Sequence, residues 1–406
     1  MKTEKFRLIL TTVCAVLIVA VSTAAQSSRP RRVSPPDTLL GPEPKSPPAK
    51  DKSAPLLDVK PAKPVGSAPA SSDTTHAYQL FQQKQYAAAA REAKQIAAND
   101  PGNSEAWKLA GFSEFFLKQY ADASVDLQKA LNLQRAARQE DSHTVDALAE
   151  SYILAEKFDL ALPLLVTVTT RPGAKPEASF LYYRGLAEFK TGKAADAEKS
   201  FNAAVKANPK DAPSLLYLGQ IALTRNDLDT AISALNRATL NDARLAAAWF
   251  LLTSAYLRRA ASAADETKSS ADYLSAVRTG EVLTRLRSDE EGLGLYGRAL
   301  IGAKQYARAA QVLDRAAAND NASGITLYLL GLAQSRANNF PKAIAALERA
   351  LAKSPGDVNV YRELGYDYEK TKQYPKAFLL YQKALEVAPN DTDFKDSLER
   401  VRPFAK

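Results

Sequence analysis

A tripeptide recurs at a fixed interval along the sequence, and this internal period constrains the fold more than any other feature. The tripeptide Lys-Gln-Tyr ends at Tyr86 and again at Tyr120, a period of about 34 residues. It recurs at Tyr306 and Tyr374, which lie two periods apart, and Phe340 stands midway between them. A short fixed period means that one structural unit is used many times, and that each unit buries its apolar side against its neighbours. The chain is therefore not organised around a single central core.

Small residues occupy fixed places within the units. An alanine stands three positions after each of these aromatic residues and after their equivalents in the intervening units, and in most units a second alanine follows seven positions later. In most units a glycine stands ahead of the aromatic position. Each of these glycines comes four positions after a large residue. The first alanines are Ala89, Ala123, Ala161, Ala197, Ala231, Ala309, Ala343 and Ala377. The glycines are Gly111, Gly185, Gly219, Gly297, Gly331 and Gly365.

The spacing of apolar residues within a unit predicts two helices. Trp107 and Gly111 belong to a first apolar set, and Tyr120 and Leu127 to a second, with the i, i+3, i+4, i+7 spacing of one helical face. A glycine inside a helix costs about 1 kcal/mol relative to alanine, so its recurrence at one place predicts close packing against a large side chain. Prolines end several units because they cannot continue a helix. These prolines are Pro101, Pro209, Pro355 and Pro389.

These columns resemble the tetratricopeptide repeat, and the resemblance extends from position 72 to position 401 in nine units. It implies an all-α chain, an α-solenoid in which helix-turn-helix repeats stack into a right-handed superhelix. It further implies that the first helices line a concave groove. Members of this family bind peptides or protein surfaces and rarely catalyse reactions.

The pattern also suggests boundaries within the repeats. An insertion near residues 260–272 is expected to lengthen the helix that contains Tyr256, so that Tyr273 begins the next helix. It predicts a first sub-array over residues 72–259 and a second over residues 260–390. Residues 391–406 are predicted to include a capping helix, with Phe394 and Val401 packed against the last repeat. Such caps shield the apolar end of a repeat array.

The N-terminal segment up to Ala25 has the order of a secretory signal peptide. Lys2, Lys5 and Arg7 precede an apolar run from residue 8 to residue 21, and small residues follow up to Ala25. The run is borderline in length for a membrane-spanning helix. Two interpretations stay open, namely cleavage after Ala25 and a retained inner-membrane anchor that tethers the protein through residues 8–25. Either one predicts an exported protein, in the periplasm or on the extracytoplasmic face of the inner membrane.

Residues 26–71 are predicted to be a disordered linker. Proline occurs eleven times between positions 29 and 70. Such a segment cannot bury enough apolar surface to offset the entropy lost on ordering. If the leader is retained, the linker stands the repeats off the membrane; otherwise it is a solvated tail.

Composition argues against chemistry in the repeats. The chain has one cysteine, Cys14, which lies in the leader, and two histidines. We find no catalytic or phosphate-binding motif, and we expect no catalytic residue, metal or cofactor. The net charge is +9, but residues 1–70 hold 11 basic and 5 acidic residues, which is +6 of this total. We therefore expect no nucleic-acid partner.

The resemblance places certain side chains of the first helices in the groove, aromatic in early units and cationic in later ones. The predicted groove residues are Phe112, Phe116, Tyr182, Phe189, Arg258, Arg298, Tyr328, Arg336, Arg362 and Tyr366. The alternative is that the aromatic residues pack between repeats and the arginines are solvated. Lys108 and Phe112 stand where some family members clamp a terminal carboxylate, but no asparagine column accompanies them.

We expect a non-enzymatic scaffold of the cell envelope that binds a partner peptide or protein and helps to assemble an envelope or secretion complex. The first alternative is a carbohydrate-binding or cell-wall-binding repeat protein, and the second is an accessory domain of an enzyme. If the cationic groove is correct, changing Arg298, Arg336 and Arg362 to Glu abolishes partner capture and leaves the helical content intact.

Overall fold

The repeats are rich in alanine and leucine, which favour helix. The computed structural model describes residues 73–173, 175–318 and 321–405, and this part of the chain contains nineteen α-helices, one short 3-10 helix and no strand. The prediction of an all-α chain is therefore confirmed. The helices are α2 (Thr75–Gln82), α3 (Tyr86–Asn99), α4 (Ser104–Phe116), α5 (Tyr120–Ala136), α6 (Ser142–Leu154), α7 (Phe158–Thr169), α8 (Ala178–Lys190), α9 (Ala194–Ala207), α10 (Ala212–Thr224), α11 (Leu228–Asn241), α12 (Ala246–Ser262), α13 (Glu266–Leu286), α14 (Glu290–Gly302), α15 (Tyr306–Ala316), α16 (Gly324–Arg336), α17 (Phe340–Lys353), α18 (Val358–Lys370), α19 (Tyr374–Val387), α20 (Thr392–Val401) and the 3-10 helix η2 (Arg402–Phe404).

The described residues fall into two compact units, which we describe separately. The N-terminal unit ends at Ile221 and the C-terminal unit begins at Ala222, so the boundary lies within α10. The predicted division at residues 259 and 260 stays a prediction, as does the handedness of the superhelix. The predicted leader (1–25) and linker (26–71) lie outside the described residues. None of the described helices is long and apolar enough to cross a membrane.

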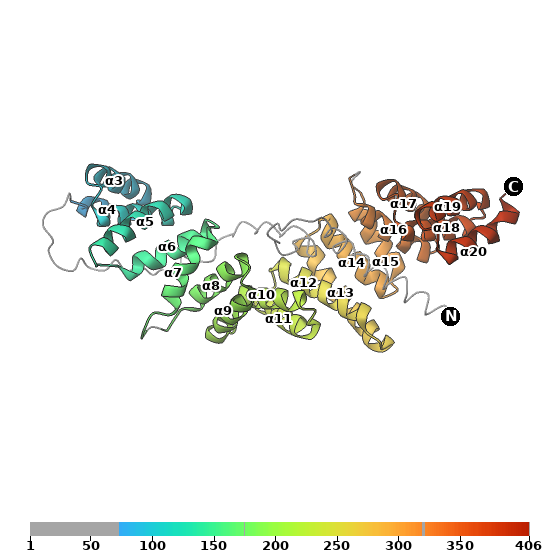
Figure 1. Ribbon diagram of the computed structural model, residues 1–406, viewed down its shortest axis with the longest axis horizontal. Helices are drawn as coiled ribbons and strands as arrows, with labels where there is room; N and C mark the ends of the chain where they lie inside the picture. Colours follow the sequence, from blue (N-terminus) through green and yellow to red (C-terminus); the bar gives the residue numbers. More distant parts are fainter. Residues whose placement is uncertain (1–72, 174, 319–320, 406) are drawn as a thin grey trace. The chain divides into compact units, whose positions relative to one another are not determined.

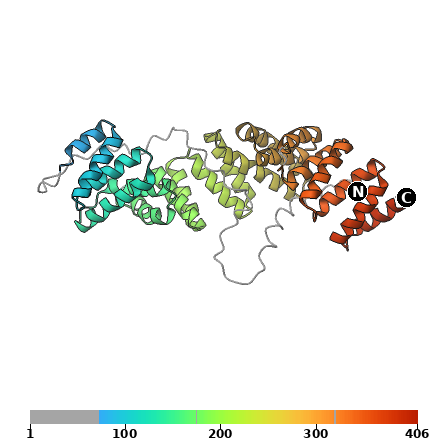
Figure 2. The same ribbon diagram turned by 90° about the horizontal axis from the view of Figure 1, so that it is seen from above.

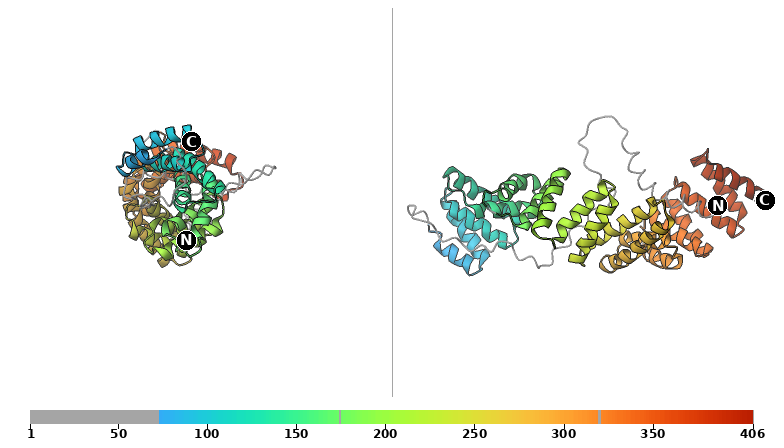
Figure 3. Two further views of the ribbon diagram at one scale, coloured as in Figure 1. Left: turned by 90° about the vertical axis from the view of Figure 1, so that its left-hand side faces the viewer. Right: turned by 90° about the horizontal axis from the view of Figure 1, so that it is seen from below.

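Each unit is a stack of antiparallel helix pairs (Figure 1). From α2 to α19 the helices form nine consecutive pairs, which matches the predicted number of repeats. From α2 to α9 and from α11 to α20 each helix contacts the next along the chain, and Figures 2 and 3 show the pairs of a unit following one another side by side. First helices of neighbouring pairs also contact each other, as α4 does with α2 and α6, and α16 with α14 and α18. The first helices therefore form a continuous layer inside each unit.

The short turns within the pairs place a residue in the left-handed region of backbone space. Lys84, Lys118, Lys304 and Lys372 each follow a first helix with φ between 60° and 62°. Glu156, Asn226 and Asn338 stand at the same place with φ between 57° and 62°, and Gly192 follows α8 there with φ 80°. A left-handed residue after a helix lets the chain reverse while the last carbonyl groups keep hydrogen-bond donors. The Lys-Gln-Tyr repeat is therefore the signature of this turn.

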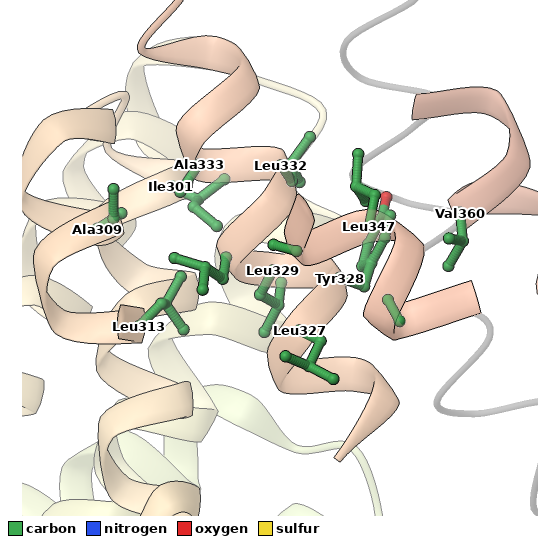
Figure 4. Packing of buried hydrophobic residues seen from close by; sticks show 14 of the residues in the cluster. Ile301, Ala309, Leu313, Leu327, Tyr328, Leu329, Leu332, Ala333, Leu347 and Val360 are labelled. Carbon is green, nitrogen blue, oxygen red and sulfur yellow. The ribbon is translucent and has the colours of Figure 1, made fainter. Parts of the chain in front are cut away.

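The glycine column marks the closest approach between the two helices of a pair. A methyl group added at Gly297 would stand 2.5 Å from Cγ of Leu313 on the second helix. Figure 4 shows Leu313 among the buried side chains of α14–α18. The same small-to-large contact joins Gly111 to Leu127, Gly185 to Phe201, Gly331 to Leu347, and Gly365 to Tyr381. These contacts confirm that the recurring glycines serve close packing.

The predicted insertion lengthens a helix pair and adds only a short loop. Helix α12 has 17 residues and α13 has 21, and residues 263–265 alone separate them. Arg259 of α12 holds the buried carboxylate of Asp272 on α13 at 2.7 Å. Tyr273 therefore lies inside α13, and the expectation that it begins the next helix is wrong. The inserted residues are predominantly good helix formers, so they extend both helices.

Helix α20 follows the last repeat in the C-terminal unit. Asp391 begins it by accepting a hydrogen bond from the backbone N–H of Phe394. The side chains of Phe394 and Val401 are almost fully buried, and the ring of Phe394 lies 6.1 Å from that of Tyr381 on α19. This helix covers apolar surface of α19 that a further repeat would otherwise cover.

Candidate functional site

The aromatic residues predicted in early repeats pack between helices. Phe112 is buried, and Phe116 stacks on Tyr86 with ring centroids 4.9 Å apart. In a separate cluster, the ring of Tyr182 lies 6.3 Å from that of Tyr217, and Phe189 lies 5.3 Å from the same ring. The structure therefore places these aromatic side chains in two internal clusters, as the alternative interpretation expects.

The predicted arginines are not simply solvated. Arg258 donates hydrogen bonds to the backbone carbonyl of Leu223 at 3.1 Å and to the side-chain oxygen of Asn226 at 2.9 Å. These bonds hold α12 against the turn between α10 and α11. Arg298 on α14 is also engaged with neighbouring groups. Arg258 therefore takes part in interactions within the C-terminal unit.

Two further arginines join neighbouring repeats of the C-terminal unit. Arg336, at the end of α16, donates to Glu363 on α18 at 2.9 Å. Arg362 on α18 donates to Asp391 at 2.8 Å, at the start of α20. Glu363 is almost fully buried, so loss of its cation would leave an uncompensated charge inside the protein. These arginines are therefore structural cross-links, whatever else they bind.

Buried polar groups gather beneath these cross-links. Ser335 donates its hydroxyl proton to the carboxylate of Asp367 at 2.5 Å. Burial raises the pKa of Asp367 to about 7, against the opposing hydrogen bond from Ser335. Figure 4 shows Tyr328 among the buried side chains around Leu347. The Tyr328 hydroxyl and one oxygen each of Glu363 and Asp367 have no hydrogen-bond partner among the described residues.

Helix α18 also carries an exposed aromatic side chain, which is flanked by cations. Tyr366 on α18 is 41% exposed. The ammonium of Lys370 lies 5.1 Å from its ring centroid and the guanidinium of Arg336 5.8 Å. Lys370 forms no ion pair with the residues that the structure describes, and its charge faces solvent. We call Tyr366, Arg336 and Lys370 the Tyr366 cluster.

The predicted groove residues include Arg336, Arg362, Tyr328 and Tyr366 but not Glu363 and Asp391, the carboxylates that pair with the two arginines. A signal for Glu363 exists, because the equivalent positions in the two preceding repeats are Leu329 and Leu295. A charged residue in an otherwise apolar column must find a partner, and a neighbouring repeat is where that partner stands. Asp367 gives the same signal, because its equivalents in the two preceding repeats are Ala333 and Ala299, whereas Ser335 gives none.

A family model described as tetratricopeptide repeat matches residues 147–212, 184–246 and 328–392. These stretches of the chain are therefore tetratricopeptide repeats. Tetratricopeptide repeats are protein-interaction scaffolds, and no enzyme family is indicated. No curated protein matches the chain by sequence.

Several solved tetratricopeptide-repeat structures are similar to this protein. YrrB, a TPR protein with an unusual peptide-binding site, is 18% identical with a TM-score of 0.43, over 50% of this chain and 99% of its own. MamA from Desulfovibrio magneticus RS-1 is 21% identical with a TM-score of 0.39, over 45% of this chain and 97% of its own. A tetratricopeptide repeat protein from Parabacteroides merdae is 13% identical with a TM-score of 0.41, over 64% of this chain and 98% of its own.

Proposed function

We propose that this protein is a non-enzymatic scaffold of the cell envelope that holds a partner polypeptide at the Tyr366 cluster. The observation that carries the proposal is the exposure of Tyr366 between Arg336 and Lys370 on a first helix of the C-terminal unit. Exposed tyrosines flanked by cations are frequent anchors of protein interfaces.

The chemistry of the cluster favours an acidic segment as the partner. Lys370 has no carboxylate of its own among the described residues, so a partner carboxylate would gain a charge-assisted hydrogen bond without breaking an existing pair. Arg336 is already paired with Glu363 and contributes its positive field and the stacked face of its guanidinium. The Tyr366 ring would supply apolar contact area beside the charge. The partner segment should therefore carry an Asp or Glu next to an apolar residue.

The envelope part of the proposal comes from the sequence that precedes the repeats. The charged, apolar and small residues up to Ala25 support export, and the proline-rich segment that follows supports a tether or spacer. An exported scaffold with an acidic partner would fit a role in assembling an envelope or secretion complex. Protease protection in intact cells compared with spheroplasts tests this placement, and cytoplasmic protection in both would refute it.

The partner test uses crosslinking followed by charge reversal. A photo-crosslinking amino acid at position 366 of the full chain should capture a partner in cells, whereas the same residue at Lys383 on α19 should not. Once the captured protein is identified, Lys370→Glu should weaken its binding by about tenfold or more. Lys383→Glu makes the same charge change in the same repeat and should leave affinity within about twofold. Equal affinity of the two variants would refute the role of the cluster.

Reversing all three arginines is a less decisive experiment than the sequence suggested. Arg336 and Arg362 cross-link neighbouring repeats through Glu363 and Asp391. Reversal would place like charges together at both contacts and destabilise the C-terminal unit. Lost capture would then follow from lost structure, so Lys370, which makes no such pair among the described residues, is the better probe.

A further inference from the structure

A buried carboxylate in the N-terminal unit has no cation beside it among the described residues. Glu150 on α6 is 3% exposed. The hydroxyl of Tyr183 on α8 donates to one carboxylate oxygen at 3.3 Å, which is a long hydrogen bond. The other oxygen has no hydrogen-bond partner among the described residues. A buried carboxylate with so little support requires an explanation, because such groups are normally paired.

Other buried glutamates on the first helices are paired with cations. In the N-terminal unit, Lys94 holds Glu114, and Arg184 holds Glu188 at 2.8 Å. In the C-terminal unit, Arg336 holds Glu363. Glu150 stands apart from these, since it makes no ion pair with any residue that the structure describes.

The cations on the helices around Glu150 are committed elsewhere. Arg171 donates to Asp146 at 2.7 Å, and Lys157 donates to Ser124 at 3.0 Å. Arg184 is held by Glu188, as described above. None of these can pair with Glu150 without leaving its present partner. None of these three residues therefore supplies the cation that Glu150 lacks.

Two tyrosines surround the carboxylate. Tyr183 and Tyr120, at the start of α5, both interact electrostatically with Glu150 and with each other. Both rings are half-buried, so each keeps part of its surface open to solvent. Aromatic faces next to a carboxylate are the combination that binds ammonium and guanidinium groups, by cation–π attraction and a charge-assisted hydrogen bond.

We propose that Glu150, Tyr120 and Tyr183 form a recognition site for a lysine or arginine side chain of a bound polypeptide. The site lies in the N-terminal unit and is independent of the Tyr366 cluster. The side chain would pass between the two tyrosines and donate to the free oxygen of Glu150. The N-terminal unit would then bind a basic residue of the partner, independently of what the C-terminal unit binds.

The protonation of Glu150 makes the proposal testable through pH. Burial raises the pKa of Glu150 to about 7, against the hydrogen bond from Tyr183, and the nearby charges of Glu177 and Asp146 raise it further. Tyr120 is the remaining titratable group that faces it. Because a cation binds the ionised form, binding should become about tenfold tighter between pH 6 and pH 8.

The experiment titrates the full chain, carrying 13C-labelled tyrosine, with N-acetyl-lysine methylamide. Signals of Tyr120 and Tyr183, assigned with Tyr→Phe variants, should shift with a dissociation constant on the order of 10 mM at pH 8. The neutral analogue N-acetyl-norleucine methylamide should leave them in place. Glu150→Gln should abolish the shift, whereas Glu177→Gln, at an exposed neighbour, should keep the affinity within about twofold.

Three results would overturn the proposal. The first is an unshifted wild-type spectrum when the lysine probe is present at about ten times the expected dissociation constant. The others are equal binding by Glu150→Gln and equal binding of the norleucine analogue.

A further experiment identifies the source of the cation. Replacing the basic residues between positions 29 and 63 with Gln should shift both tyrosine signals without added probe if the chain's own segment fills the site, and should leave them unchanged if a separate partner does.

Discussion

Replacing Gly297 by alanine tests whether close helix approach holds the repeats together. Both Gly297 and Gly294 lie on α14, and alanine at either place improves helix propensity by about 1 kcal/mol. A methyl group at Gly297 would stand 2.5 Å from two carbon atoms of Leu313. At Gly294 the nearest atom is the Thr326 hydroxyl oxygen at 4.0 Å, which is ordinary van der Waals contact.

The two substitutions should therefore have opposite effects on stability. Leu313 is fully buried, and a branch-point carbon cannot move aside as the end of a flexible chain can. Overpacking of this kind costs about 3 kcal/mol, so Gly297→Ala should lower the free energy of unfolding by about 2 kcal/mol after the gain in propensity. Gly294→Ala should raise it by about 1 kcal/mol.

Hydrogen exchange of the full chain is the appropriate assay, because a repeat array can open locally before it unfolds as a whole. Amides of α14 and α15 should exchange faster in Gly297→Ala and slower in Gly294→Ala. The double variant Gly297→Ala/Leu313→Ala should be less destabilised than the sum of its single changes, since the overlap is then removed. If Gly297→Ala protects these amides as well as Gly294→Ala does, the packing role of the glycine column is wrong.

Three further predictions follow from other parts of the fold. Lys304→Gly, at φ 60°, should stabilise the C-terminal unit by about 1 kcal/mol in denaturant titrations, whereas the same change at Lys383 inside α19 should destabilise it by a similar amount. Asp367 has an ordinary pKa of 3.8 that burial raises to about 7, so the stability that its proton contributes is complete below about pH 4 and is lost as the pH rises to 7. Relative to Asp367→Asn, the wild type should therefore lose up to about 4 kcal/mol over this window, and a flat difference would contradict the assignment. Phe394→Ala should cost about 3–5 kcal/mol locally and expose α20 to proteolysis, with the exposed Lys395→Ala as the control.

The helix pairs were predictable because their cause is local and repeated. The glycine column and the alanines after Tyr120 and Tyr306 report the same contact in unit after unit, and a single sequence therefore samples it many times. The length of α13 was less predictable. A repeat that occurs once with extra residues offers no second copy to show whether they form a loop or more helix.

The site was less predictable, because its partners stand on different repeats. Arg336 meets Glu363 across 27 residues and Arg362 meets Asp391 across 29, so in each pair the two charges stand on different helix pairs. The pattern places these side chains on first helices but does not say which opposite charge faces them. An arginine is paired only if the residue that faces it on the neighbouring repeat carries the opposite charge. Its availability to bind a partner depends on the same residue.

The extended α12–α13 pair gives the protein a place where its length can change at small energetic cost. Residues 261–271 at its tip are largely exposed, whereas Ala260 and Asp272 just inside it are buried. The loop at residues 263–265 can therefore accept a fluorophore, an epitope tag or a small inserted domain without disturbing the packed layers. In an evolving lineage, the same tip is where a repeat array of this kind can acquire a new module while every existing contact is retained.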